Sequence, residues 1–294
     1  MTCYHPIAAW RSQGGVSARS GKTPIVFSAS NADLKKPLQL PCGRCIGCKQ
    51  ARAKAWTLRC IHELEYHDCA SFITLTYDNN HLYKCKDGSL NKKEFQLFLK
   101  RLREEIKKYE DREIMFYHGA EYGEQYLRPH HHAIIFGYDF PDKGLIDGSV
   151  DDYISPMLDR CWGNGMCTLS NVSIEAIAYV AGYVLKKQLG PKAKYRYDGL
   201  LPEYNTMSKG IGLRWLQDHG EQVYQHDMIV EDGIISKPPK YYDRKYADQN
   251  RILEVKENRI NSIKPRTKKS LVAQEKAHIK RNKLYSKRTY EASR

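Results

Sequence analysis

The sequence lacks the apolar segments that would place a protein in or across a membrane. No apolar run approaches the roughly 18 residues that a membrane helix needs, and residues 1–6 do not begin the basic and then apolar pattern of a secretory signal. These absences argue against a membrane protein and against an exported one. We therefore expect a soluble protein, made in the cytosol, without a membrane partner.

A phosphate-binding loop is also missing. The pattern G-x-x-x-x-G-K-[ST], with which many helicases and ATPases hold nucleotide phosphates, occurs nowhere in the chain. A function that requires strand separation would therefore depend on another protein.

The cysteines lack the features of a disulfide framework. There are nine, an odd number, and no export signal accompanies them. Cys42, Cys45 and Cys48 follow C-x2-C-x2-C spacing and can give three thiolates to a zinc ion, whereas an iron–sulfur cluster is disfavoured because no Cys-Pro pair follows. Three residues are candidates for the fourth ligand: Cys3, which we favour, His5 and Cys60. Unliganded thiols in a reducing cytosol are the alternative.

Positive charge is abundant and unevenly distributed. The net charge is +14, and residues 237–294 hold 18 lysines and arginines against 6 acidic residues, so this segment carries most of the excess. Basic proteins gain affinity for nucleic acids by displacing counterions from phosphates. The segment, with Lys268 and Lys269, is a candidate for non-specific DNA binding, and a flexible, solvated end is the alternative.

Strand and helix patterns alternate in the middle of the chain, which indicates an α+β fold. Residues 71–77 are β-branched and aromatic and end in Asp-Asn-Asn, as a strand before a turn does. Residues 95–109 place apolar side chains every three or four positions, and Asn91 with Glu94 can form a capping box before this helix. Further strands are predicted over 114–122, 130–136 and 167–172, and further helices over 51–66, 153–162, 173–188 and 248–260.

Four segments follow from these patterns. They are an N-terminal appendage with the cysteines over 1–66, a nicking domain over 67–195, an extension of its core over 196–236 and a basic tail over 237–294.

The run His130-His131-His132 lies in one of the predicted strands. Side chains alternate along a strand, so His130 and His132 project from one face and His131 from the other. Two imidazoles on one face can share a divalent ion, and a magnesium site would need oxygen ligands in addition. The preceding strand offers Glu121 as the third ligand, with Glu124 as second choice. A surface histidine cluster without a metal is the alternative, and the apolar continuation into residues 133–136 argues against it.

The predicted helix over 173–188 carries two tyrosines one turn apart. On a helical wheel Tyr179, Tyr183 and Lys186 fall together, roughly opposite an apolar arc that can supply the core contacts. The arc consists of Ile174, Ile177, Ala178, Ala181, Val184 and Leu185. Core packing is the usual role of such a tyrosine pair, but here the arc already provides it.

A tyrosine hydroxyl, with a pKa near ~10, needs a neighbouring cation or a metal-polarised phosphate to attack a phosphodiester. Lys186 and the ion at the histidines would supply them. The product would be a phosphotyrosine link to DNA. Two tyrosines allow a second cut while the first remains attached, and DNA binding alone would not require the pair.

The order of these motifs resembles that of the HUH endonuclease superfamily, and more narrowly the replication initiators of gokushovirus-type microviruses. The segments that carry the resemblance are Phe72 to Tyr77, Glu121 to Gly123, Arg128 to His132, and Tyr179 to Lys186, with further similarity at 41–45, 207–212 and 237–243. His131 departs from the family pattern, which usually has an apolar or aromatic residue there.

The resemblance implies an antiparallel central sheet flanked by helices, metal ligands at His130 and His132, and nucleophiles at Tyr179 and Tyr183. It implies nicking of single-stranded or supercoiled phage DNA at an origin, with magnesium or manganese, in the cytoplasm of the host bacterium. A 5′-phosphotyrosine would form and a host polymerase would extend the free 3′ hydroxyl, with a host helicase unwinding the strands. Lys187 and Arg128 are further candidates for DNA contacts.

Two other functions compete with this one. A plasmid relaxase or a single-strand transposase of the same superfamily would more often show one dominant tyrosine or another motif order. A non-catalytic, zinc-stabilised DNA-binding protein would use the same histidines and tyrosines only for contact, and it would form no covalent adduct.

Overall fold

The structure is a computed structural model that describes residues 3–17, 23–85, 88–123, 126–186, 193, 197–262 and 266–286. The chain divides into a large unit, Arg52–Ser262, and a small unit that combines Met1–Ala51 with Ile263–Arg294. Helix α1 (Ile46–Leu64) begins in the small unit and continues into the large one. Each unit is described by itself.

A seven-stranded antiparallel sheet forms the centre of the large unit, in the order β10-β5-β6-β4-β9-β8-β7. Its strands are β4 (Ala70–Thr76), β5 (Met115–Tyr122), β6 (Pro129–Phe136), β7 (Gly144–Leu145), β8 (Tyr153–Ile154), β9 (Cys167–Asn171) and β10 (Tyr204–Met207). The α+β expectation and the strands predicted over 71–77, 114–122, 130–136 and 167–172 are confirmed to within two residues.

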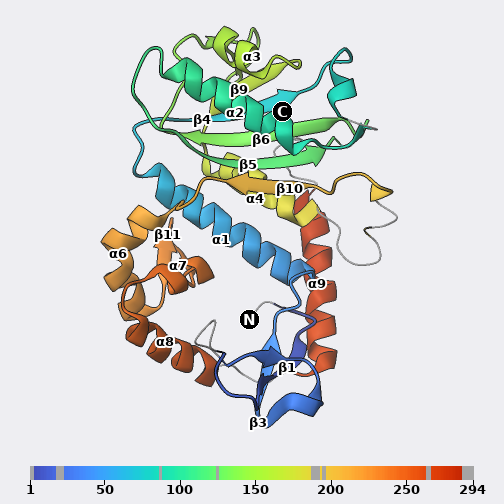
Figure 1. Ribbon diagram of the computed structural model, residues 1–294, viewed down its shortest axis with the longest axis vertical. Coiled ribbons are helices and arrows are strands. Elements are labelled where there is room, and N and C mark those ends of the chain that lie inside the picture. Colours follow the sequence, from blue (N-terminus) through green and yellow to red (C-terminus); the bar gives the residue numbers. More distant parts are fainter. Residues whose placement is uncertain are drawn as a thin grey trace. The chain divides into compact units, whose positions relative to one another are not determined.

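Helices cover both faces of this sheet (Figure 1). Helices α2 (Lys92–Ile106) and α3 (Pro156–Trp162) pack on one face, where Phe98, Leu102 and Trp162 join Ile73 and Ile135 in a buried core. Helix α4 (Ile174–Lys186) and the adjoining part of α1 pack on the other. The core of this second face contains Phe72, Tyr117, Ile134, Phe136, Ile177 and Val180.

Local signals fix the ends of these helices. The Asn91 side chain accepts a hydrogen bond from the amide of Lys93, as predicted for an N-cap, whereas Glu94 accepts one from Asn164. The helix predicted over 153–162 begins later, because Tyr153 and Ile154 pair in the sheet. Its observed start has Ser155 as N-cap and Pro156 in the first turn.

The remainder of the large unit is a helical layer: α6 (Leu213–His226), α7 (Lys240–Lys245) and α8 (Gln249–Asn261), with the hairpin β11 (Ile229–Glu231) and β12 (Ile234–Ser236). These helices pack around Leu58 of α1, Tyr224 and Tyr242. The helix predicted over 248–260 is confirmed as α8. Sequence patterns missed α6, and they read Pro239 only as a breaker, whereas it is the N-cap of α7.

The small unit contains a three-stranded antiparallel sheet, β2-β1-β3, and helix α9 (Lys268–Ser286). The strands are β1 (Ile7–Ser12), β2 (Ile25–Val26) and β3 (Ala32–Leu40). Sequence patterns did not indicate these strands, because few of their side chains are buried and no alternating pattern results. They also missed α9, whose apolar residues do not gather on one side.

Candidate functional site

The pairing of β6 with its two neighbours assembles one polar cluster on the α4 face of the sheet. His132 lies opposite Thr74 of β4 and Gly119 of β5, and His130 lies opposite Glu121 of β5. The Nε2 atom of His132 is 3.4 Å from Oε1 of Glu121, and the two histidine rings are stacked with centroids 6.3 Å apart. The structure thus brings together the three residues that the sequence proposed as ligands.

Each of these two histidines has one ring nitrogen held by the protein. Nδ1 of His130 is 2.6 Å from the carbonyl oxygen of Arg128, and Nδ1 of His132 is 3.1 Å from Oγ1 of Thr74. A carbonyl oxygen only accepts, so Nδ1 of His130 carries the proton and the lone pair of the neutral ring is on Nε2. Burial lowers the pKa of His130, which favours that neutral ring. Such contacts are typical of metal-binding histidines.

His131 points to the opposite face, as the alternation predicts. It is fully buried, and its ring nitrogens are 3.0 Å from Nε2 of His118 and 3.1 Å from the hydroxyl of Tyr77. Burial lowers the pKa of His131 to about 3, and burial also lowers that of His118. His131 is therefore a neutral member of the core.

The two tyrosines of α4 lie beside His132. Its ring centroid is 5.1 Å from that of Tyr183 and 5.6 Å from that of Tyr179, and the two tyrosine rings are 5.0 Å apart. Tyr183 is buried and Tyr179 is half-buried. Burial, together with the neighbouring Glu121 and Tyr179, raises the pKa of Tyr183 well above its ordinary value. The site therefore combines two imidazoles, a carboxylate and two phenols.

The helical wheel was wrong about which side of α4 faces the core. Ile174 is 45% exposed and Ala178 is exposed, although both belong to the predicted apolar arc. The buried side is rotated from the predicted one and includes Val180 and Tyr183. The physical reason is that α4 lies against strands that carry polar residues at this point, so the tyrosines can face the sheet.

Two glycines of the neighbouring strand leave room for these side chains, and the sequence analysis did not single them out. A Cβ on Gly119 would lie 2.6 Å from Cδ2 of Tyr183, and one on Gly123 would lie 2.9 Å from Cε1 of His130. Neither contact is tolerable without movement. Gly119 stands within a predicted strand, where glycine often marks a close approach, and this is the signal that was available.

Arg128 has a structural role beside the site. Its guanidinium donates to the carbonyl oxygen of Tyr77 at 2.6 Å and to Oδ1 of Asn79 at 2.7 Å. It thereby fixes the residue whose carbonyl holds His130. Lys187 and Glu124 lie outside the described residues, and of Lys186 only the position in α4 is described.

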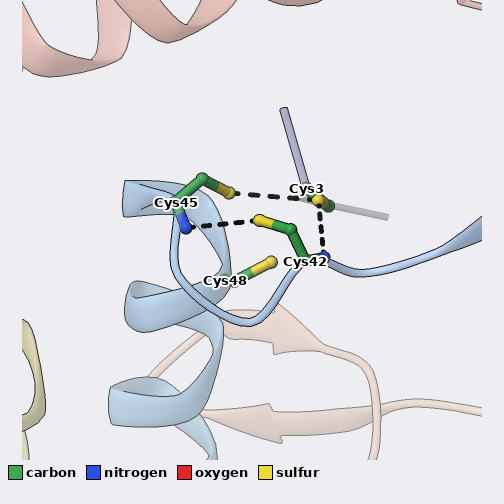
Figure 2. A group of neighbouring side chains, drawn as sticks. All are labelled: Cys3, Cys42, Cys45 and Cys48. Carbon is green, nitrogen blue, oxygen red and sulfur yellow. Dashed lines mark hydrogen bonds between the residues drawn. The ribbon is translucent and has the colours of Figure 1, made fainter. Parts of the chain in front are cut away.

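The four cysteines proposed as zinc ligands come together in the small unit (Figure 2). The sulfur atoms of Cys3, Cys42, Cys45 and Cys48 all lie within 4.8 Å of one another, so the cluster can bind a structural metal ion such as zinc. Burial raises the pKa of Cys45, but the Tyr4 amide and the neighbouring cysteines outweigh it and lower this pKa to about 7. Cys60, an alternative fourth ligand, is instead buried in the core beneath α4.

The two lysines proposed for DNA binding begin α9. Lys268 and Lys269 are both exposed, as are Lys276, Lys280 and Arg281 further along the helix. Exposed cations at this density suit contact with phosphates.

The sequence comparisons identify the family. Residues 70–188, which span the sheet, the histidine strand and α4, match the sequence model of the replication-associated protein ORF2 family. The chain is 30% identical over 256 residues to the replication-associated protein VP4 of Bdellovibrio phage phiMH2K, covering 84% of this chain and 77% of that protein. The chain belongs to this family of phage replication-associated proteins.

Two further relatives come from other phages. The replication-associated protein ORF2 of Spiroplasma virus 4 is 32% identical over 216 residues, with 70% of this chain and 67% of the relative covered. The replication-associated protein ORF4 of Chlamydia phage 1 is 29% identical over 211 residues, with 69% and 52% covered. No solved structure matches the chain. Within the described part of the chain, no helix combines the length and the apolar character of a membrane span.

Proposed function

We propose that this protein starts rolling-circle replication of a phage genome by nicking one DNA strand with a tyrosine. The observation that carries the proposal is the convergence of His130, His132 and Glu121 with Tyr179 and Tyr183 on one face of an antiparallel sheet. This donor set suits a divalent ion, and the sheet with its central histidine strand is the arrangement expected of an HUH endonuclease. Membership of a phage replication family supports the same function.

The proposed ligands fit the group. The Nε2 atoms of His130 and His132 and the carboxylate of Glu121 would hold magnesium or manganese, with DNA phosphate oxygens completing the shell. A divalent ion bound there would withdraw charge from the scissile phosphate.

The chain's own residues would carry out the transfer. A tyrosine hydroxyl oxygen attacks the phosphorus, and the bond from phosphorus to the 3′ oxygen breaks. The phenol proton leaves as the new bond forms, and the 3′ oxygen takes up a proton to become the free hydroxyl. The strand that remains is attached through its 5′ phosphate to the tyrosine, and the reverse reaction reseals a circle.

The burial of the two phenols suggests their order. Tyr179 is half-buried, and we propose that it attacks first, whereas the buried Tyr183 attacks after DNA has bound. Lys186 lies one turn beyond Tyr183 on α4, where a lysine would stabilise a phenolate. Host polymerase and helicase would then extend and unwind the strand.

The test uses a tiled set of single-stranded oligonucleotides that spans the genome encoding this chain, with magnesium or manganese. We expect one oligonucleotide to give a conjugate that survives denaturant, and the double variant Tyr179→Phe, Tyr183→Phe to bind that DNA without forming it. If the wild type binds DNA but forms no conjugate with either metal, the chain is a non-catalytic DNA-binding protein and the proposal fails. A conjugate with transfer-origin DNA only would indicate a relaxase.

A further inference from the structure

The small unit has almost no hydrophobic core. Among its described residues, the buried apolar side chains are those of Ala9, Ala32 and Leu271, together with the cysteines Cys3 and Cys45. Larger apolar side chains are exposed instead: Phe27 is 64% exposed and Leu34 is 62% exposed. Small folding units with little apolar burial usually depend on a disulfide or a structural metal. The small unit needs another source of stability.

The cysteine cluster has the geometry of a site for one ion. A tetrahedral zinc ion with bonds of about 2.3 Å to sulfur places its ligand sulfurs about 3.8 Å apart. The sulfur atoms of Cys3 and Cys45 are 4.0 Å apart, and all four sulfurs fall within 4.8 Å. A cluster of several iron atoms would hold its thiolates further apart. Four sulfur ligands in a tetrahedron select zinc over harder metals.

Backbone amides point at three of these sulfurs. The amides of Tyr4, Cys42 and Cys45 lie 3.5, 3.3 and 3.4 Å from the sulfurs of Cys45, Cys3 and Cys42, respectively (Figure 2). Such contacts stabilise negative charge on sulfur, which a metal-bound thiolate carries. Figure 2 also shows that the ligands come from two separate segments, the start of the chain and the turn that leads into α1.

The residues that follow Cys3 connect the cluster to α9. The hydroxyl of Tyr4 is 2.7 Å from Nδ1 of His278, and Nε2 of His5 is 2.6 Å from Oε2 of Glu275. Both partners are on α9, at the other end of the sequence. The position of Cys3 therefore determines where Tyr4 and His5 meet this helix.

We propose that Cys3, Cys42, Cys45 and Cys48 bind one zinc ion that replaces a hydrophobic core in the small unit and holds α9 in place through Tyr4 and His5. The ion joins the first residues of the chain to the start of α1. Zinc binding is then coupled to the order of α9, the helix with the exposed lysines. This inference does not depend on the nicking activity.

The first experiment measures metal in the reduced full-length protein. The background is His130→Ala, His132→Ala, which removes the other candidate metal site. We expect about one zinc per chain, and a thiolate-to-cobalt charge-transfer band typical of four sulfur ligands after cobalt exchange. Cys45→Ser should lose both, whereas the matched control Cys69→Ser, which changes a half-buried cysteine of the large unit, should keep both. Protein that retains no zinc and gives no such band, or that contains iron–sulfur or a Cys3–Cys45 disulfide instead, overturns the proposal.

The second experiment measures amide hydrogen exchange with and without a zinc chelator. We expect faster exchange in β1 and α9 after zinc removal, and unchanged exchange in β5 and β6. Tyr4→Phe removes one contact to α9 and no sulfur, so it should keep zinc and still speed exchange in α9. Equal exchange in α9 with and without zinc would refute the role of the ion in holding this helix.

Discussion

The two faces of β6 use the same side chain for opposite purposes. On one face His131 is fully buried, with both ring nitrogens within 3.1 Å of polar partners in the core. On the other face His130 and His132 each have Nδ1 held by the protein and Nε2 on the side of Glu121 or open to a ligand. The residue type is the same, and its surroundings decide whether it is structural or available for chemistry.

The helices that pack on each face explain the difference. On the His131 face, α2 and α3 supply aromatic rings such as Phe95 and Trp162, and they exclude polar groups except His118 and Tyr77. On the other face, α4 supplies Tyr179 and Tyr183. A polar cluster remains between α4 and the sheet only because the strands provide glycine and threonine at this point.

The largest expected effect is the loss of nicking when a ligand is removed. His132→Ala and His130→Ala should each lower the rate of conjugate formation by about 100-fold or more, because even indirect partners of metal ligands are worth about 10- to 100-fold. Single-turnover assays with labelled DNA would measure it. Circular dichroism should show an intact fold. A variant of either residue with a normal rate would remove it from the ligand set.

His131 should give the reverse result. His131→Ala leaves a cavity and takes a partner from His118 and Tyr77, so we expect the free energy of unfolding to fall by about 2–4 kcal/mol. Urea denaturation would measure the loss, and at low temperature the conjugate should form at a rate close to that of the wild type. Equal stability of the variant and the wild type would contradict the core role of this histidine.

Sequence patterns predicted the sheet and its histidine strand because their periodicity is local. The alternation from His130 to Phe136 determines the faces without any knowledge of the partners. Glu121 was placed correctly because it lies in the adjoining strand, and the two pair as a hairpin. The cysteine cluster was predicted from its spacing for the same reason, although the choice of Cys3 over Cys60 rested on preference alone.

The failures concern contacts that are not local. The wheel for α4 assumed that apolar residues face the sheet, and it could not include the polar strands on which Tyr183 packs. Thr74 was missed because its role exists only through pairing with His132, which is distant in the sequence. The strands of the small unit were missed because they bury few side chains.

Gly119 tests whether the site face depends on the room left by the strand. Gly119→Ala places a Cβ 2.6 Å from the Tyr183 ring, so the ring must move, and we expect conjugate formation that requires Tyr183 to fall by about 10- to 100-fold. Assays in a Tyr179→Phe background would isolate this tyrosine. The control is Gly182→Ala in α4, whose Cβ meets nothing within 4 Å and which should stabilise the helix by about 0.5–1 kcal/mol. If both variants nick normally, Tyr183 does not need its observed position.

Thr74 allows the finest comparison, because each face of the sheet has a threonine that contacts a histidine. Thr74 Oγ1 is 3.1 Å from Nδ1 of His132, and Thr206 Oγ1 is 2.8 Å from Nδ1 of His118. Thr74→Val keeps the shape and removes the hydroxyl, so we expect about 10-fold weaker manganese binding, measured by calorimetry, with little change in stability. Thr206→Val should leave manganese binding unchanged and lower the free energy of unfolding by about 1–2 kcal/mol, because it leaves a buried ring nitrogen without its partner. If the two variants weaken manganese binding equally, the two faces are not chemically separate. If neither does, the hydroxyl of Thr74 has no part in orienting His132.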